Sequence, residues 1–218
     1  MSAERPSEDG TIGAGEAERS ELERELLERR EAALAQVVKF GDPVLKSRAS
    51  PMSDFGGDLR SEVDRMIAIM RDGLGVGLAA TQLGTLRRLL VFQPSHDAQP
   101  TALINPEVEW RSDDLVIAEE GCLSLPRVSM DVERPLHVTV TALDLDAEQV
   151  RIEASGLEAR VIQHEIDHLD GVLIFDRAPR EQRRGALRAL REGDSYSPPI
   201  EDEEETVEEG HREPRTDA

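Results

Sequence analysis

The chain has 218 residues, a formal net charge of −20 and only 3% aromatic residues. Its length suits one domain of ordinary size with tails, and its acidity argues against nucleic-acid binding over the whole surface and against specific DNA recognition. The N-terminus lacks the apolar core of a signal peptide, no stretch approaches about 18 apolar residues, and the single cysteine excludes an internal disulfide, so we expect a cytoplasmic protein without a membrane segment.

The two ends of the chain differ in composition from its centre. Residues 1–17 are polar and rich in Gly and Glu, which predicts disorder. Residues 20–34 carry Glu/Arg pairs at helical spacing beside a thin apolar stripe, which predicts a helix that is solvated or weakly docked. We therefore assign residues 1–36 to an acidic extension, disordered to helical, and residues 193–218 to an acidic disordered tail, leaving residues 37–192 as one globular domain.

The first half of the globular segment predicts one helix and several short strands. The spacing of Val63, Met66, Ile67 and Met70 predicts an amphipathic helix over residues 61–70. Short strands are predicted over residues 89–92, 102–104 and 115–118, and a hairpin over residues 138–143 and 150–154.

The second half predicts two further helices. One covers residues 157–169 and stops at Gly171, and another follows Pro179 and ends near Gly193. Strands followed by helices, without regular alternation, indicate an α+β fold.

The helix predicted over residues 157–169 contains the run HEIDH, from His164 to His168. Two histidines four residues apart lie on one face of a helix. The glutamate after the first histidine, Glu165, can reach a water on a metal that both imidazoles bind. Asp167 lies on a different face, where we expect it to stabilise the helix or its surroundings. The run is the H-E-x-x-H pattern of metal-activated hydrolases, although this pattern also arises by chance.

A metal that activates water needs three protein ligands and one open position. The residues after His168 offer no further histidine, which counts against a protease of the metzincin type. Upstream, Cys122 in the run EGCLS is a candidate third ligand, although a lone cysteine is more often a buried small hydrophobe. A zinc-dependent peptidase remains the alternative enzyme. A binding module with a structural metal is a third interpretation, but such a site needs no base like Glu165.

A third run, GVGLAATQ at residues 75–82, matches neither glycine-rich phosphate-binding pattern. Together with EGCLS and QHEIDH, in this order, it resembles the three signature motifs of bacterial peptide deformylases. The similarity covers roughly residues 37–192, and no position in the three motifs departs from the pattern. The resemblance implies antiparallel or mixed sheets around a central metal-bearing helix, with a C-terminal helix.

The same resemblance implies an activity and a cofactor. Members of this family remove the formyl group from the N-terminal formylmethionine of new polypeptides and release formate. They work with one Fe(II) per chain, for which Zn, Ni or Co can substitute. Motif matching implies metal ligands at Cys122, His164 and His168, a general acid–base at Glu165, oxyanion-stabilising groups at Gln82 and the Leu123 N–H, and substrate-groove positions at Gly77 and Glu120.

The last predicted helix carries a stripe of four arginines, Arg180, Arg184, Arg188 and Arg191. A solvated face is the ordinary interpretation. Because relatives act on nascent chains and can dock through their C-terminal helix, the resemblance adds the ribosome as a candidate partner.

Overall fold

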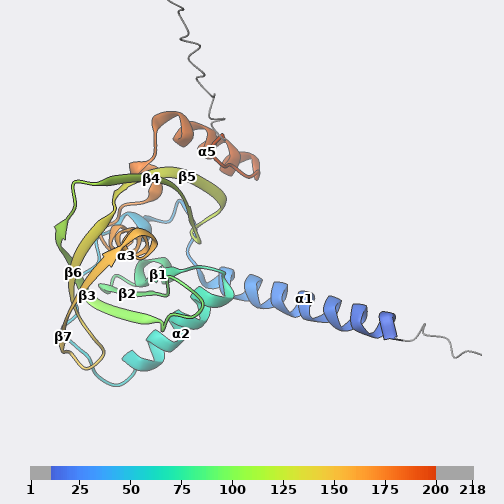
Figure 1. Ribbon diagram of the computed structural model, residues 1–218, viewed down its shortest axis with the longest axis horizontal. Helices are drawn as coiled ribbons and strands as arrows, with labels where there is room; N and C mark the ends of the chain where they lie inside the picture. The colour runs from blue at the N-terminus through green and yellow to red at the C-terminus, as the bar shows by residue number, and fades with distance from the viewer. Residues whose placement is uncertain (1–10, 200–218) are drawn as a thin grey trace, which may run out of the picture.

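The computed structural model describes residues 11–199. Its centre is the helix α3 (Gly156–Leu169), which carries the HEIDH run and is buried on most sides. Two antiparallel sheets surround this helix, as Figure 1 shows. The expected α+β architecture, with sheets around a central helix and a helix near the C-terminus, is confirmed.

The larger sheet has five strands in the order β1-β2-β3-β6-β7. Its strands are β1 (Gly77–Ala79), β2 (Leu89–Phe92), β3 (Thr101–Arg111), β6 (His137–Leu143) and β7 (Gln149–Ser155). One face packs on α3, where Leu90, Val140 and Ile162 belong to one buried apolar cluster. The other face packs on α2 (Leu59–Asp72), through Met66, Met70 and the far side of β2. The short central strand β2 is therefore apolar at every position because it is covered on both faces.

The smaller sheet is the hairpin of β4 (Leu115–Cys122) and β5 (Leu125–Pro135). Two C-terminal helices, α4 (Ile174–Arg177) and α5 (Arg180–Glu192), cover β5. Residues 193–197 continue along the same strand, where the Ser129 N–H donates to the Tyr196 carbonyl at 2.9 Å. The packed chain therefore extends beyond the boundary expected at residue 192, while residues 200–218 of the expected disordered tail lie outside the described residues.

The N-terminal extension forms one long helix, α1 (Thr11–Gln36). The expectation of disorder is wrong for residues 11–17, because extending an existing helix costs far less than starting one; residues 1–10 lie outside the described part. Figure 1 shows α1 projecting from the domain, with its C-terminal end beside α2. Ala33 and Val37 join the apolar cluster of α2, and Arg65 donates to Gln36 at 2.8 Å.

The strands were predicted less completely than the helices. The strands β1 and β5, the one-turn helix α4 and two short 3-10 helices, η1 (Pro43–Lys46) and η2 (Ala80–Leu83), were not predicted. β5 does carry a signal, because Val128, Met130 and Val132 alternate with polar residues and are all buried. No helix within residues 11–199 is long and apolar enough to cross a membrane.

Candidate metal centre

Helix α3 is held in place at its C-terminal end by a close backbone contact. Gly171 follows the helix with a φ of +73°, and an added Cβ there would lie 2.8 Å from the Lys46 carbonyl carbon. The Ala49 N–H also donates to the carbonyl of Leu169 at 2.7 Å. Only glycine fits this turn without strain, so the close approach sets the axial position of the histidines.

The β4–β5 hairpin brings Cys122 to the histidines. The strand pairing shifts register between Gly121 and Cys122, directly before the two-residue turn to Leu125. Such irregularities in a ladder turn a side chain away from its regular direction. The Cys122 Sγ consequently lies 3.2 Å from Nε2 of His168.

The three expected ligands meet at one point. Ligand atoms of Cys122, His164 and His168 all lie within 4.8 Å of one another, and no other such cluster occurs in the described part of the chain. One sulfur and two nitrogens around a tetrahedral metal are separated by about 3.5 Å, given metal–ligand bonds of about 2.0–2.3 Å. Thiolate and imidazole donors suit iron, zinc, nickel and cobalt. The residues therefore fit a divalent transition metal.

A buried polar atom beside this cluster indicates a further group. Oε2 of Glu165 and Nδ1 of His168 are the buried side-chain atoms without a hydrogen-bond partner among residues 11–199. Unpartnered buried polar atoms are rare in folded proteins and commonly mark a water, an ion or a reacting group. The unpartnered oxygen of Glu165 therefore indicates a further group beside the metal cluster, whereas Nδ1 of His168 lies on the other side of the ring from the Nε2 that faces Cys122.

The electrostatics favour ionised sulfur. Burial alone would raise the pKa of the Cys122 thiol, but the neighbouring imidazoles of His168 and His164 outweigh it and hold that pKa well below its usual value. A thiolate is the form of cysteine that ligates metals. Burial likewise opposes a charged His164, but its hydrogen bonds to Cys122 and Glu120 raise the pKa of the imidazole. Metal binding must therefore displace a proton from this cluster.

Glu165 is buried against the backbone of Gly77. Burial raises the pKa of its carboxyl to about 7, which suits a group that both accepts and returns protons near neutral pH. A Cβ added at Gly77 would lie 2.3 Å from Glu165 Oε1. The Glu165 side chain therefore fits only because residue 77 is a glycine. The resemblance had implied only that Gly77 lines the substrate groove.

Gln82 faces the metal cluster in a fixed orientation. Its Oε1 accepts a hydrogen bond from the Ala79 N–H at 2.9 Å, which leaves the Nε2 amide as a donor toward Ser124 Oγ at 3.3 Å and Cys122 Sγ at 3.6 Å. Since only the nitrogen of an amide side chain donates, this contact decides which end points at the site.

Leu123 lies in the turn next to Cys122, and its N–H makes no hydrogen bond to a backbone or side-chain acceptor in the described chain. Its carbonyl accepts from the Lys39 ammonium at 3.4 Å, and the Phe40 N–H donates to Ser124 at 2.9 Å. Hydrogen bonds to the carbonyls of Leu123 and Ser124 therefore hold the turn in place, and the Leu123 N–H remains available to donate to a ligand.

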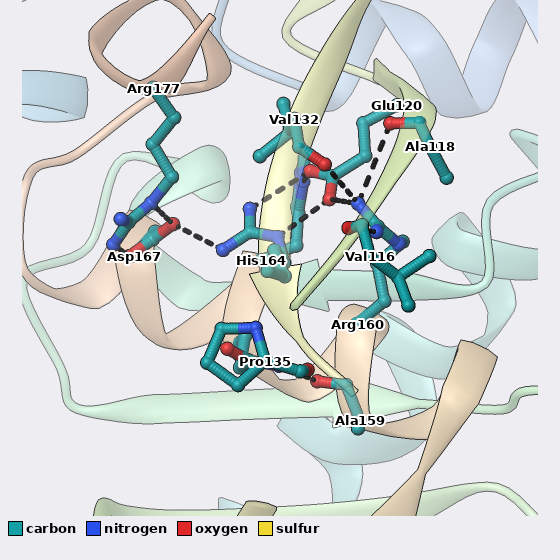
Figure 2. A network of polar contacts seen from close by, with 12 residues as sticks. Val116, Ala118, Glu120, Val132, Pro135, Ala159, Arg160, His164, Asp167 and Arg177 are labelled. Carbon is teal, nitrogen blue, oxygen red and sulfur yellow. Dashed lines mark hydrogen bonds and ion pairs between the residues drawn. The ribbon is translucent and has the colours of Figure 1, made fainter. Parts of the chain in front are cut away.

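A network of buried charges joins the hairpin to α3, as Figure 2 shows. The Glu120 carboxylate accepts from Nδ1 of His164 at 2.9 Å and from the Arg160 guanidinium at 2.6 Å. Arg134 donates two hydrogen bonds to Glu120, at 2.6 and 2.9 Å, and a third to Asp167 at 2.8 Å. Arg177 completes the network by pairing with Asp167.

The network fixes the tautomer of His164, an expected metal ligand. Because Nδ1 of His164 bonds to Glu120, its Nε2 remains for the metal. Burial opposes ionisation of Glu120, but hydrogen bonds from Arg134 and His164 hold the pKa of its carboxyl well below its usual value. Nothing in the sequence pattern indicated Arg134, whereas the spacing of Arg160, four residues before His164 on the same helix, places it near that histidine.

A cavity of about 910 Å³ opens over the metal cluster. Seven of the eight expected site residues line it: Gly77, Gln82, Glu120, Cys122, Leu123, His164 and Glu165. Its volume lies in the range of pockets that enclose small ligands or short peptides. His168 lies beneath this lining and is almost fully buried.

Comparison with known proteins agrees with this geometry. The family model described as Polypeptide deformylase matches residues 34–184. The chain belongs to the polypeptide deformylase family. It is accordingly an enzyme that removes the N-terminal formyl group from new polypeptides in a metal-dependent reaction, and the peptidase alternative is not favoured.

Individual relatives are similar over most of their length. A peptide deformylase of Parafrankia sp. is 42% identical over 160 residues, which is 73% of this chain and 87% of the relative. The peptide deformylase structure from Synechococcus elongatus in complex with actinonin has a TM-score of 0.68 at 40% identity, covering 73% of this chain and 88% of that one. The structure from Thermotoga maritima has a TM-score of 0.64 at 43% identity, covering 66% and 96%.

Adding a methyl group at Gly77 should displace Glu165. We expect Gly77→Ala to lower kcat/KM by about 100-fold, the cost of moving a catalytic group by about 1 Å, while metal content stays at the wild-type level. Gly121→Ala is the matched control, because it lines the same cavity and its added Cβ meets nothing closer than 4.0 Å. Equal activities of the two variants would contradict the space requirement at Gly77.

Removing the guanidinium of Arg134 should destabilise the fold. We expect Arg134→Met to lower the free energy of unfolding by about 3–5 kcal/mol, because it leaves two buried carboxylates short of partners. Arg151 bridges Glu109 and Glu153 on the exposed surface, so Arg151→Met should leave the Tm nearly unchanged. Thermal and denaturant unfolding measure both effects, and similar stabilities of the two variants would contradict the role of the network.

Proposed function

We propose that deformylation takes place at the cluster of Cys122, His164 and His168, with Glu165 as its general acid–base. The observation that carries the proposal is the unpartnered, buried Oε2 of Glu165 next to three converging metal-ligand atoms. A structural metal site would need no such oxygen. The cavity above the cluster supplies room for a peptide N-terminus.

The first step assigned to the protein is removal of a proton from water. A divalent metal bound by these residues would supply a Lewis acid that lowers the pKa of water toward about 7. Glu165 accepts the proton as the water oxygen attacks the formyl carbon. With its pKa raised to about 7 by burial, the carboxyl then returns the proton to the departing amine. The products are formate and a free methionyl N-terminus.

The oxyanion that develops on the formyl oxygen needs donors that are already in position. The Nε2 amide of Gln82 is oriented toward the cluster by the contact with Ala79, and the Leu123 N–H has no other acceptor in the described part. One donor of this kind typically contributes about 2.7–4 kcal/mol to the transition state. We assign both groups to this role.

Glu120 receives a positioning role in this proposal. Its side chain is almost fully buried and its carboxylate is bonded to Arg134, Arg160 and His164. Contact with substrate at this position therefore falls to its backbone, on the edge of β4, and not to the carboxylate. Gly77, which lines the cavity from β1, can contact substrate in the same way.

We infer that iron(II) is the metal in the cell, following the resemblance of the three motifs. The ligand set alone does not select iron, because nickel, cobalt and zinc bind such donors more tightly. A zinc-, nickel- or cobalt-substituted protein is thus expected after aerobic purification. Full activity of anaerobically purified protein that contains only zinc would contradict this assignment.

Replacing Glu165 by Gln should separate catalysis from metal binding. We expect Glu165→Gln to retain the metal and to lower turnover of formyl-Met-Ala-Ser by about 10²–10⁴-fold, the usual contribution of a general acid–base. Release of formate measures activity, and metal analysis of the same sample measures occupancy. Substantial residual turnover would refute the role of Glu165, and cleavage of internal peptide bonds would restore the peptidase interpretation.

We further propose that the enzyme works in the cytoplasm on chains leaving the ribosome, with α5 as the contact. Arg180, Arg184, Arg188 and Arg191 are exposed on α5, while Ala186 and Ala189 are buried against the domain. A row of exposed arginines suits the phosphates of ribosomal RNA.

The acidic residues 198–218 follow this helix after five intervening residues and should compete with RNA for its arginines. Deleting them is expected to strengthen co-sedimentation with ribosomes at low salt, and replacing the four arginines by Gln should abolish it. Unchanged co-sedimentation of both variants would contradict the contact.

A further inference from the structure

The N-terminal helix α1 borders the catalytic cavity. The family match begins at residue 34, so nearly all of α1 lies outside the part shared with the family. Arg30, which precedes that match, nevertheless lines the cavity over the metal cluster, next to Leu34 at the first matched position. This chain therefore has a wall of its substrate cavity that the shared catalytic domain does not supply.

A second cavity of about 410 Å³ adjoins the first. It lies between α1 and the end of α2, and Arg30 and Leu74 line both cavities. Its apolar lining comes from Leu26, Leu27 and Leu74, and we call it the leucine groove. Charged residues form the rest of its lining, namely Glu23, Arg29, Arg30, Arg71 and Asp72.

The leucines of this groove are unusually exposed. Leu26, Leu27 and Leu74 have exposed fractions of 62%, 59% and 73%. Single exposed leucines are common, but three around one hollow with a charged rim are typical of a binding surface. Their exposure also leaves apolar area that a ligand could remove from water.

Leu74 adds a second, independent observation. It has a φ of +60°, a conformation that costs a non-glycine residue on the order of 1–2 kcal/mol. Glycine occupies both neighbouring positions, Gly73 and Gly75. Strained residues of this kind cluster at ligand-contacting sites, and Leu74 holds its side chain at the junction of the two cavities.

We propose that the leucine groove binds an apolar side chain of the substrate polypeptide, several residues after its formylmethionine. The proposal rests on the function assigned above and names a further specificity determinant for it. The occupant follows from continuity, because a chain whose N-terminus lies over the metal cluster can pass Arg30 and Leu74 directly into the groove. The charged rim is partly paired, with Arg29 lying 3.8 Å from Asp72, so the groove favours an apolar over a charged side chain.

A scan of substrate peptides tests the proposal. The parent peptide is formyl-Met-Ala-Ser followed by five asparagines, and five others each carry one leucine in place of an asparagine. Extended residues advance by about 3.3 Å each, so the set samples about 16 Å of chain. With the wild-type enzyme, we expect leucine at one or two positions to lower KM about three- to tenfold while kcat stays constant, as for uniform binding of an apolar group.

Variants on α1 locate the effect. The ratio of KM values for the parent and leucine peptides should fall to about one in the double variant Leu26→Gln/Leu27→Gln. It should fall equally in Leu74→Asn, where asparagine tolerates the positive φ of this position. Leu22→Gln is the matched control, since Leu22 is equally exposed on the same helix but lines neither cavity. It should retain the wild-type ratio. Thermal unfolding confirms that each variant is folded.

The outcomes separate this proposal from the function on which it rests. Formate release from formyl-Met-Ala-Ser without any leucine preference in the longer peptides would overturn the proposal and leave deformylation intact. A preference that survives Leu26→Gln/Leu27→Gln would overturn it as well. Self-association of the wild type that the double variant loses, again without a preference, would show that a second copy covers the groove. Absence of formate from every peptide would refute the deformylase function and this substrate assignment together.

Discussion

The carboxylate of Glu120 is the interaction on which the metal centre depends. It belongs to the β4–β5 hairpin, which also carries Cys122, and it bonds to His164 on α3. Arg134 and Arg160 neutralise it, so a buried charge that would otherwise be costly becomes a fixed link between the two elements. Among the polar contacts between the hairpin and α3 outside the ligand cluster itself, it is the one that reaches an expected metal ligand directly, whereas Arg134–Asp167 and the contacts of Arg160 with strand carbonyls join the elements farther from the cluster.

The same link explains why α3 can be so thoroughly buried while carrying polar side chains. Its charged and polar groups are bonded to the hairpin and to α4, through Asp167 and its two arginine partners. The exceptions within residues 11–199 are Oε2 of Glu165 and Nδ1 of His168, which find no hydrogen-bond partner. The fold therefore supplies partners to Glu120, to Nδ1 of His164 and to Asp167, and leaves without one the carboxylate oxygen that we propose moves a proton. This division is the expected one for a preorganised catalytic centre.

The acidic N-terminal segment is more closely connected to the site than a solvated extension would be. Its last turns pack into the cluster of α2 through Ala33 and Val37, and Arg30 and Leu34 reach the catalytic cavity. A helix that is weakly amphipathic by itself is thus held at one end by the domain. This placement of the helix brings its exposed leucines, Leu26 and Leu27, beside Leu74, so that the three form one groove.

The sequence by itself determined the chemistry of this protein. The spacing of HEIDH places two histidines on one helix face with a glutamate beside the first, and the three motifs in order indicated the family and proposed Cys122 as the third ligand. Local patterns also predicted α2, α3, α5, most of α1 and strand β2, but not the short helix α4. The tertiary structure decided how these elements are joined around the site. The joining contacts are the partners of Glu120, the contact of Gly77 with Glu165, and the approach of Gly171 to Lys46. These depend on residues distant in sequence being packed to within a few ångströms, for which neither propensity nor periodicity leaves a signal.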